Sequence, residues 1–152
     1  MAAFPHMDDI TIILCSPLRR TMQTALFSFG PLYTRGLKLI LWSALREWGN
    51  GASNIGYPVE EMEKETAALP MDLRLLNKGW ELETDSEAEG AERSNRVRKD
   101  LYALGEILLQ GGIWKGLPVE KHNTPVHILV VSHGGFLANV MWANGKPSPF
   151  QY

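Results

Sequence analysis

The chain has 152 residues, 45% of them hydrophobic, and a formal net charge of −2. This length suits one compact domain with a buried core, so we expect a single domain over residues 1–152. The slightly acidic balance gives little support to nucleic-acid binding by counterion release, and no run of about twenty apolar residues offers a membrane span. We therefore expect a cytoplasmic protein with a small-molecule partner, and neither nucleic acid nor membrane as a partner.

The first predicted element is a strand over residues 10–15, an apolar run that ends at Ser16. Because the run has no polar face, it is typical of a strand in a parallel sheet that is covered on both sides. It contains the one cysteine of the chain, Cys15, which we expect to be a buried apolar side chain. A helix over residues 21–29 follows.

The turn between this strand and this helix has the composition of an anion site. Arg19 and Arg20 follow Ser16 closely, at the start of the helix. Backbone N–H groups at a helix start are unpaired and carry partial positive charge, and a guanidinium beside them adds further donors for a phosphate or a carboxylate. We expect these three residues to bind a small anion.

The middle of the chain supplies one further strand and two helices. In chain order we predict a strand over 37–42, a loop over 43–57, a helix over 58–65, irregular chain over 69–90 and an amphipathic helix from near Ser86 to about residue 109. The strand completes a βαβ unit, and the loop is rich in glycine and asparagine with no period. Loops at the carboxyl ends of parallel strands often carry functional residues.

The last part of the chain predicts a loop over 112–125, a third apolar strand over 126–131 and a final helix over 136–144. Strands that alternate with helices in this way predict an α/β fold with a parallel sheet. The sequence shows no internal repeat, domain linker or low-complexity tract.

His133 follows the third strand, in a turn that continues with Gly134 and a second glycine. The carboxyl ends of parallel strands meet at one edge of a sheet, so His133 is expected near Arg19 and Arg20. Glycine lets a ligand approach the backbone closely, which adds Gly134 to the candidate binding residues. His122 and His127 lack such a context and are interpreted as a loop residue and a strand-face residue.

Two motifs resemble those of a known family. Ser-Pro-Leu-x-Arg-x-x-Gln-Thr-Ala, which contains Arg20, resembles the second signature of the histidine phosphatase superfamily, the phosphoglycerate-mutase-like proteins. Val-Val-Ser-His-Gly-Gly-Phe-Leu, which contains His133, resembles the carboxyl-terminal histidine motif of that superfamily. From Phe-Pro-His-Met-Asp onward the chain is similar to the fungal branch. The resemblance implies a three-layer α/β/α fold in which Arg20 and His133 bind phosphate.

A third, shorter motif is Leu45-Arg46-Glu47, which resembles a Leu-x-Glu segment of the family. In many members that glutamate is the proton donor, so the resemblance implies this role for Glu47, beside His133. An ordinary surface glutamate on a loop is the alternative. We expect no cofactor and no metal ion.

The nucleophile of the family is a histidine in an Arg-His-Gly motif, at the end of an opening strand well ahead of Ser16. This sequence contains no Arg-His pair. His6 does not replace that histidine, because Phe4-Pro5-His6 aligns with the connection into the second strand of the family. Without an in-line imidazole, two-step phosphoryl transfer has no first step.

Three hypotheses of function follow. In the first, a shortened homologue uses His133 and Glu47 for non-phosphoryl acid–base chemistry, such as isomerisation, cyclisation or dehydration, on a small anionic or hydroxylated metabolite. In the second, the chain is a non-catalytic remnant that binds a small anion or a protein. In the third, it is a fragment of a conventional histidine phosphatase or phosphomutase.

The resemblance also implies an order for the strands. The three predicted strands correspond to contiguous strands of the family's sheet, and the absence of the family's first strand leaves residues 126–131 at an edge. An apolar edge strand exposes unpaired backbone groups that invite pairing. We therefore expect a homodimer in which the 126–131 strands of two subunits meet, or in which segments swapped between the subunits fill the gap.

Overall fold

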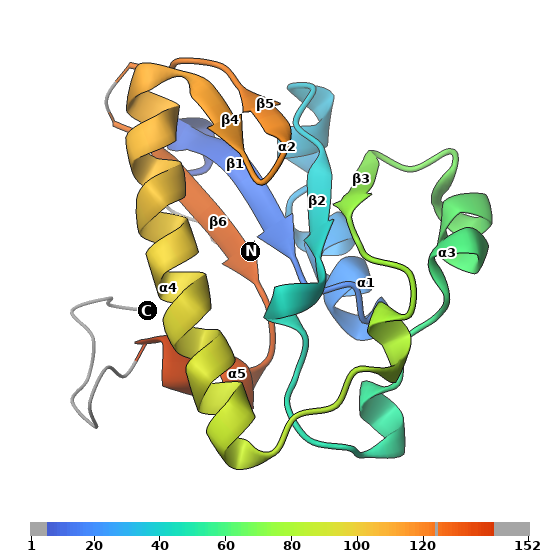
Figure 1. Ribbon diagram of the computed structural model, residues 1–152. Helices are drawn as coiled ribbons and strands as arrows, with labels where there is room; N and C mark the ends of the chain where they lie inside the picture. The colour runs from blue at the N-terminus through green and yellow to red at the C-terminus, as the bar shows by residue number, and fades with distance from the viewer. Residues whose placement is uncertain (1–5, 124, 142–152) are drawn as a thin grey trace.

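The computed structural model describes residues 6–123 and 125–141, and of residues 139–141 only the backbone. Its centre is a parallel sheet with the strand order β3-β2-β1-β6 (Figure 1). The strands are β1 (Ile10–Cys15), β2 (Leu39–Trp42), β3 (Met71–Leu75) and β6 (His127–Val131). The three strands predicted from the sequence are present and contiguous, and among the strands of the described residues β6 lies at one edge of the sheet.

Helices cover both faces of this sheet. On one face lie α1 (Arg19–Ser28), α2 (Gly30–Thr34) and α3 (Val59–Thr66), and on the other lie α4 (Glu87–Gln110) and α5 (Gly134–Met141). Each face of the sheet has its own hydrophobic core. Ile13 and Cys15 of β1 pack into the core on the side of α1, and Leu14 packs into the core on the side of α4, as the alternation of side chains along a strand requires. Figure 1 shows α4 crossing in front of the sheet. The three-layer α/β/α fold is confirmed.

The longest helix begins and ends close to the predicted residues. Its N-cap is Ser86, whose hydroxyl accepts a hydrogen bond from the backbone N–H of Glu89, while the Glu89 carboxylate accepts one from the backbone N–H of Ser86. This capping box satisfies N–H groups that the first turn cannot pair. Val97, Leu104 and Leu108 form a buried stripe of the helix, which packs against the sheet.

Residues 69–90, predicted to be irregular, contain the strand β3. The segment Met-Asp-Leu-Arg-Leu alternates apolar and charged side chains, and β3 pairs with β2 as the strand at the other edge of the sheet. Arg74 donates to the buried carboxylate of Asp72 from Nε and Nη2, at 3.0 and 2.5 Å. Charged side chains are typical of edge strands, and their polarity hid this strand from the apolar pattern.

The predicted loop over 112–125 contains a β-hairpin, formed by β4 (Gly112–Trp114) and β5 (Leu117–Val119). The two residues between the strands, Lys115 and Gly116, have φ values of 47° and 80°. Two successive residues at positive φ are the requirement of a type I′ hairpin turn. The hairpin packs Trp114 and Leu117 against the core beneath α4.

Smaller differences occur at element ends. α1 begins at Arg19 rather than at residue 21. A second short helix, α2, follows it, and Pro31 stands in the first turn of α2, where the missing N–H of proline costs no hydrogen bond. α5 begins at Gly134, two residues before the prediction, and the end predicted at residue 144 lies outside the described residues. Among the helices of the described ranges, none is long and apolar enough to cross a membrane.

Candidate functional site

The carboxyl ends of β1 and β6 bring Ser16 and His133 together. Both side chains are buried, and the Ser16 Oγ lies 2.8 Å from Nε2 of His133. The backbone N–H of Ser16 donates to the carbonyl of Val131 at 2.9 Å, which extends the pairing of the two strands up to this point. The expectation that residues remote in sequence meet at this edge is therefore met.

Arg20 completes the contact from the first turn of α1. Its Nε donates to Nδ1 of His133 over 3.2 Å. A guanidinium N–H is a donor only, so Nδ1 must be unprotonated. The neutral ring then carries its proton on Nε2, and this N–H donates to the Ser16 Oγ. The two neighbours thus select one tautomer of His133.

The surroundings of His133 oppose a second proton on its ring. Burial is the largest cause, and the positive charges of Arg20 and Arg93 add to it, so that the pKa of His133 falls from 6.5 to about 4. The imidazole is therefore neutral at pH 7. Its affinity for a further proton is low as long as Arg20 occupies Nδ1.

The remaining nitrogens of the Arg20 guanidinium contact the loop after β2. Nη1 donates to the carbonyl of Ser53 at 2.6 Å, and Nη2 donates to Oδ1 of Asn54 at 3.1 Å. Asn54 in turn donates through Nδ2 to the carbonyl of Trp48 at 2.9 Å. Two oxygens of the protein therefore occupy the positions in which this arginine would receive the oxygens of an anion.

Arg19 does not point toward this cluster. Its Nη2 donates to both carboxylate oxygens of Glu65 on α3, at 3.0 and 2.7 Å, and its guanidinium lies 4.6 Å from the ring centroid of Tyr57. Successive residues of a helix point in different directions, so Arg19 and Arg20 cannot face the same partner in the first turn. The sequence placed both arginines in one site, and the structure brings only Arg20 to His133.

Glu47 lies at the amino end of α5. A Cβ built on Gly135 would be 3.0 and 3.3 Å from the two carboxylate oxygens of Glu47 and 2.8 Å from Nε1 of Trp48. The carboxylate therefore approaches the backbone of the turn that carries His133, where the positive end of a helix dipole favours it. At Gly134 an added Cβ would meet nothing within 4 Å, so this position leaves space at the site.

Arg93 is a part of the site that the sequence reasoning missed. It is buried on α4, donates to the carbonyls of Ala44 and Arg46 at 2.8 and 2.9 Å, and lies 4.5 Å from the ring centroid of Phe136. A signal was present in the sequence, because Arg93 falls on the apolar stripe of the helix, four residues before Val97. A charged side chain on such a stripe requires a buried partner.

That partner is Asp85, which joins two buried arginines. Its Oδ1 accepts from Nη2 of Arg46 at 3.0 Å, and its Oδ2 accepts from Nη2 and Nε of Arg93 at 2.6 and 3.0 Å. In the turn after β6, the hydroxyl of Ser132 donates to the carbonyl of Leu45 at 2.7 Å. The segment that carries Glu47 is therefore attached both to α4 and to the turn after β6.

The comparison of the sequence with protein families decides the assignment. Residues 2–148 match the family described as the histidine phosphatase superfamily (branch 1). The chain belongs to the histidine phosphatase superfamily. No curated protein matches it.

In this member of the histidine phosphatase superfamily, the two motif residues assigned to phosphate, Arg20 and His133, are in direct contact. Most of the described tryptophans lie away from these two residues. Trp42, Trp80 and Trp114 are buried in the core, and Trp142 lies outside the described residues. Trp48 alone of the described tryptophans reaches the turn after His133.

A cavity of about 450 Å³ lies between α4 and the β2–β3 side of the sheet, and Trp42 and Arg93 are among its lining residues. Its other charged residues are Arg46, Arg74, Glu83, Arg96, Asp100 and Lys115. Ser16, Arg20 and His133 do not line it, and its lining is mostly polar. It is therefore distinct from the cluster formed by Ser16, Arg20 and His133.

Proposed function

We propose that this histidine phosphatase superfamily member binds a small anion between Arg20 and His133, and that His133 and Glu47 transfer protons to and from the bound molecule. The hydrogen bond from Nε of Arg20 to Nδ1 of His133 carries the proposal. It supports the proposal because it brings into contact, at the carboxyl edge of the sheet, the two residues that match the phosphate motifs of the superfamily.

The oxygens that Arg20 now contacts support an anion as the ligand. The Ser53 carbonyl and the Asn54 side chain satisfy two of its nitrogens from the 43–57 loop. A phosphate or carboxylate oxygen would make stronger, charge-assisted hydrogen bonds with the same nitrogens. In this proposal the anion replaces the two protein oxygens, and the loop moves as it binds.

Anion binding changes the proton affinity of His133. An anion that draws the guanidinium away from Nδ1 removes one cause of the lowered pKa and adds a negative charge nearby. The ring then takes up a proton and donates to the anion. Affinity for an anion is therefore expected to rise as the pH falls from 7 toward 4, where the pKa of the free His133 lies.

The catalytic use of this site is acid–base chemistry on a small anionic or hydroxylated metabolite, namely isomerisation, cyclisation or dehydration. One such step removes a proton from carbon or oxygen and another returns one. With the anion bound, the protonated His133 can donate a proton, and Glu47 offers a carboxyl group at the same turn to accept one.

Conventional phosphoryl transfer is the second candidate function, and the family match over residues 2–148 favours it. It needs an in-line imidazole that becomes phosphorylated. The printed sequence supplies the anion-binding arginine and histidine but no Arg-His-Gly motif. The experiment with p-nitrophenyl phosphate described below separates phosphoryl transfer from acid–base chemistry.

Binding is tested by titration with inorganic phosphate, and the imidazole NMR signals of His133 monitor the titration. We expect saturable shifts that Arg20→Gln abolishes. Arg19→Gln is the matched control, since the neighbouring arginine contacts Glu65 and should leave phosphate binding within about twofold of the starting affinity. Phosphate binding that survives Arg20→Gln would contradict the site.

The two catalytic candidates are separated with p-nitrophenyl phosphate. Hydrolysis that His133→Ala abolishes would favour phosphoryl transfer, and the absence of hydrolysis beside intact phosphate binding would favour acid–base chemistry. That chemistry is tested by incubation in D₂O with a small hydroxy acid and detection of deuterium at carbon. Phosphate binding with neither activity would indicate a non-catalytic anion-binding protein.

A further inference from the structure

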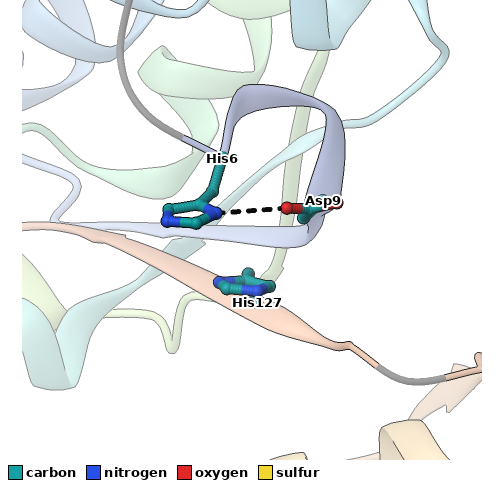
Figure 2. A group of neighbouring side chains, drawn as sticks. All are labelled: His6, Asp9 and His127. Atoms are coloured by element: carbon teal, nitrogen blue, oxygen red, sulfur yellow. Dashed lines mark hydrogen bonds and ion pairs between the residues drawn. The ribbon is translucent and has the colours of Figure 1, made fainter.

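A second cluster of polar side chains lies at the opposite end of the sheet from the anion site. Figure 2 shows His6, Asp9 and His127 close together, between the turn that precedes β1 and the first residue of β6. Each offers one ligand atom, and these atoms all lie within 4.8 Å of one another. We infer that the three side chains bind a divalent transition-metal ion, with Zn²⁺ as the best fit.

The chemistry of the donors selects this class of ion. Two imidazoles and one carboxylate are the ligands of Zn²⁺ and of neighbouring transition metals, whereas Mg²⁺ and Ca²⁺ prefer sets of oxygen ligands. Three protein ligands also leave a fourth tetrahedral position for water. Neither His6 nor His127 contacts the Arg20–His133 cluster, so this function would be additional to anion binding.

One of the three separations between ligand atoms already suits a tetrahedral ion. Ligand atoms about 2.0–2.1 Å from Zn²⁺ are about 3.3–3.4 Å from each other. Nδ1 of His6 lies 3.2 Å from Oδ2 of Asp9, which is close to that separation. The rings of His6 and His127 are stacked, with centroids 5.2 Å apart and planes 13° apart, so their lone pairs do not converge. A rotation of the partly exposed His127 side chain completes the site.

The side chain of Thr11 already holds the two ligand-bearing segments together. The hydroxyl of Thr11 donates to the carbonyl of Asp9 at 3.2 Å and accepts from the backbone N–H of His127 at 3.4 Å. The pairing of β1 with β6 shifts register at this point, between Ile10 and Ile12. Such an irregularity redirects side chains, and here it occurs beside the ligand group.

The turn that carries His6 and Asp9 is also folded without a metal. The backbone N–H of Asp9 donates to the carbonyl of His6 at 3.0 Å, and Nη1 of Arg35 donates to the carbonyl of Met7 at 2.9 Å. His6 itself has a φ of 63°, an uncommon backbone conformation for a residue other than glycine. Because this order exists before binding, little conformational entropy is lost when the ion binds.

A bound ion would attach the turn before β1 to the edge strand β6. Both segments belong to the folded state only, so binding stabilises that state. The site and the anion cluster lie at opposite ends of β1, which has six residues and is therefore about 20 Å long. One site can thus be removed without touching the other.

The test uses the full chain, freed of metal by a chelator and then titrated with Zn²⁺ alone in competition with a chromophoric indicator. We expect one ion per chain, a rise in Tm, and a Co²⁺ absorption spectrum of the intense tetrahedral type. His6→Gln and His127→Gln should each weaken Zn²⁺ binding by at least about tenfold. His122→Gln is the matched control, because His122 is exposed and lies outside the cluster.

The inference would be overturned if His122→Gln lost as much affinity for Zn²⁺ as the two cluster variants, or if His6→Gln bound Zn²⁺ as tightly as the unchanged chain. If His127→Gln does not fold, Zn²⁺ binding by His6→Gln still tests the inference, because His6 is exposed. Paramagnetic shifts of the His6 and His127 ring signals in the Co²⁺-loaded chain provide a second test. Co²⁺ that shifts the His133 signals instead would assign the metal to the anion site and reject the cluster.

Discussion

Nε of Arg20 donates to Nδ1 of His133 over 3.2 Å, across 113 positions of sequence. The bond joins the first turn of α1 to the turn between β6 and α5. It selects the tautomer of the imidazole and the direction in which the guanidinium faces, and the charge of Arg20 adds to burial in lowering the affinity of the ring for a second proton.

Removal of the Arg20 guanidinium should move the pKa of His133 back toward its ordinary value. In Arg20→Gln the charge that helps to lower the pKa of His133 is lost, so we expect that pKa to rise from about 4. Burial, the larger cause, remains, so the pKa should stay below 6.5. An NMR titration of the imidazole measures it. Arg19→Gln is the control and should leave the titration unchanged, because Arg19 contacts Glu65.

Stability should depend on pH through the same histidine. The unfolded chain binds a proton at His133 near pH 6.5, but the folded chain does so only near pH 4. The free energy of unfolding is therefore highest above pH 6.5 and falls as the pH drops to 4, by at most about 1.4 kcal/mol per pH unit from this group. Urea unfolding at pH 7 and pH 5 measures the loss. In His133→Gln the loss should be smaller, and an equal loss would show that other groups cause it.

Two glycines of α4 should respond in opposite ways to alanine. A Cβ at Gly90 would overlap the indole of Trp48, so Gly90→Ala should lower stability by about 1–3 kcal/mol and displace the neighbouring Glu47. At Gly105 nothing lies within 4 Å, and Gly105→Ala should raise stability by about 0.8–1 kcal/mol through helix propensity. Thermal unfolding followed by circular dichroism compares them. Similar effects of the two substitutions would contradict the close packing of Trp48.

Asp85 should be essential to the fold around Glu47. Asp85→Ala leaves the buried guanidinium groups of Arg46 and Arg93 without their shared carboxylate, and we expect a loss of about 3–5 kcal/mol. Glu87→Ala, two residues along and exposed, is the control and should change stability by less than about 1 kcal/mol. Chemical denaturation measures both. A loss in Asp85→Ala no larger than in the control would mean that the pair of arginines finds other partners.

The edge strand β6 leads to a prediction about assembly. Among the described strands β6 has a neighbour on one side only, and its side chains are half-buried and largely apolar. We propose that two copies of the chain pair through β6, since such edges favour strand addition. Size-exclusion chromatography with light scattering should show a dimer at micromolar concentration. A folded monomer under these conditions would reject the pairing.

The sequence by itself determined the main elements of this fold. The apolar runs at 10–15 and 126–131 predict β1 and β6, because a strand buried on both faces has no polar side, and Ser86 with Glu89 predicts the start of α4. It did not indicate β3 or the β4–β5 hairpin. In those segments edge pairing and two residues at positive φ matter more than hydrophobicity.

For the site, the motifs named Arg20, His133 and Glu47, and the parallel sheet predicted that they share one edge. Only the tertiary structure separated Arg19 from Arg20, because the direction of a side chain depends on the helix turn and on the partner it meets, here Glu65. Only the tertiary structure, too, placed His6 and Asp9 beside His127. That juxtaposition depends on the register of β1 against β6, which no local pattern encodes.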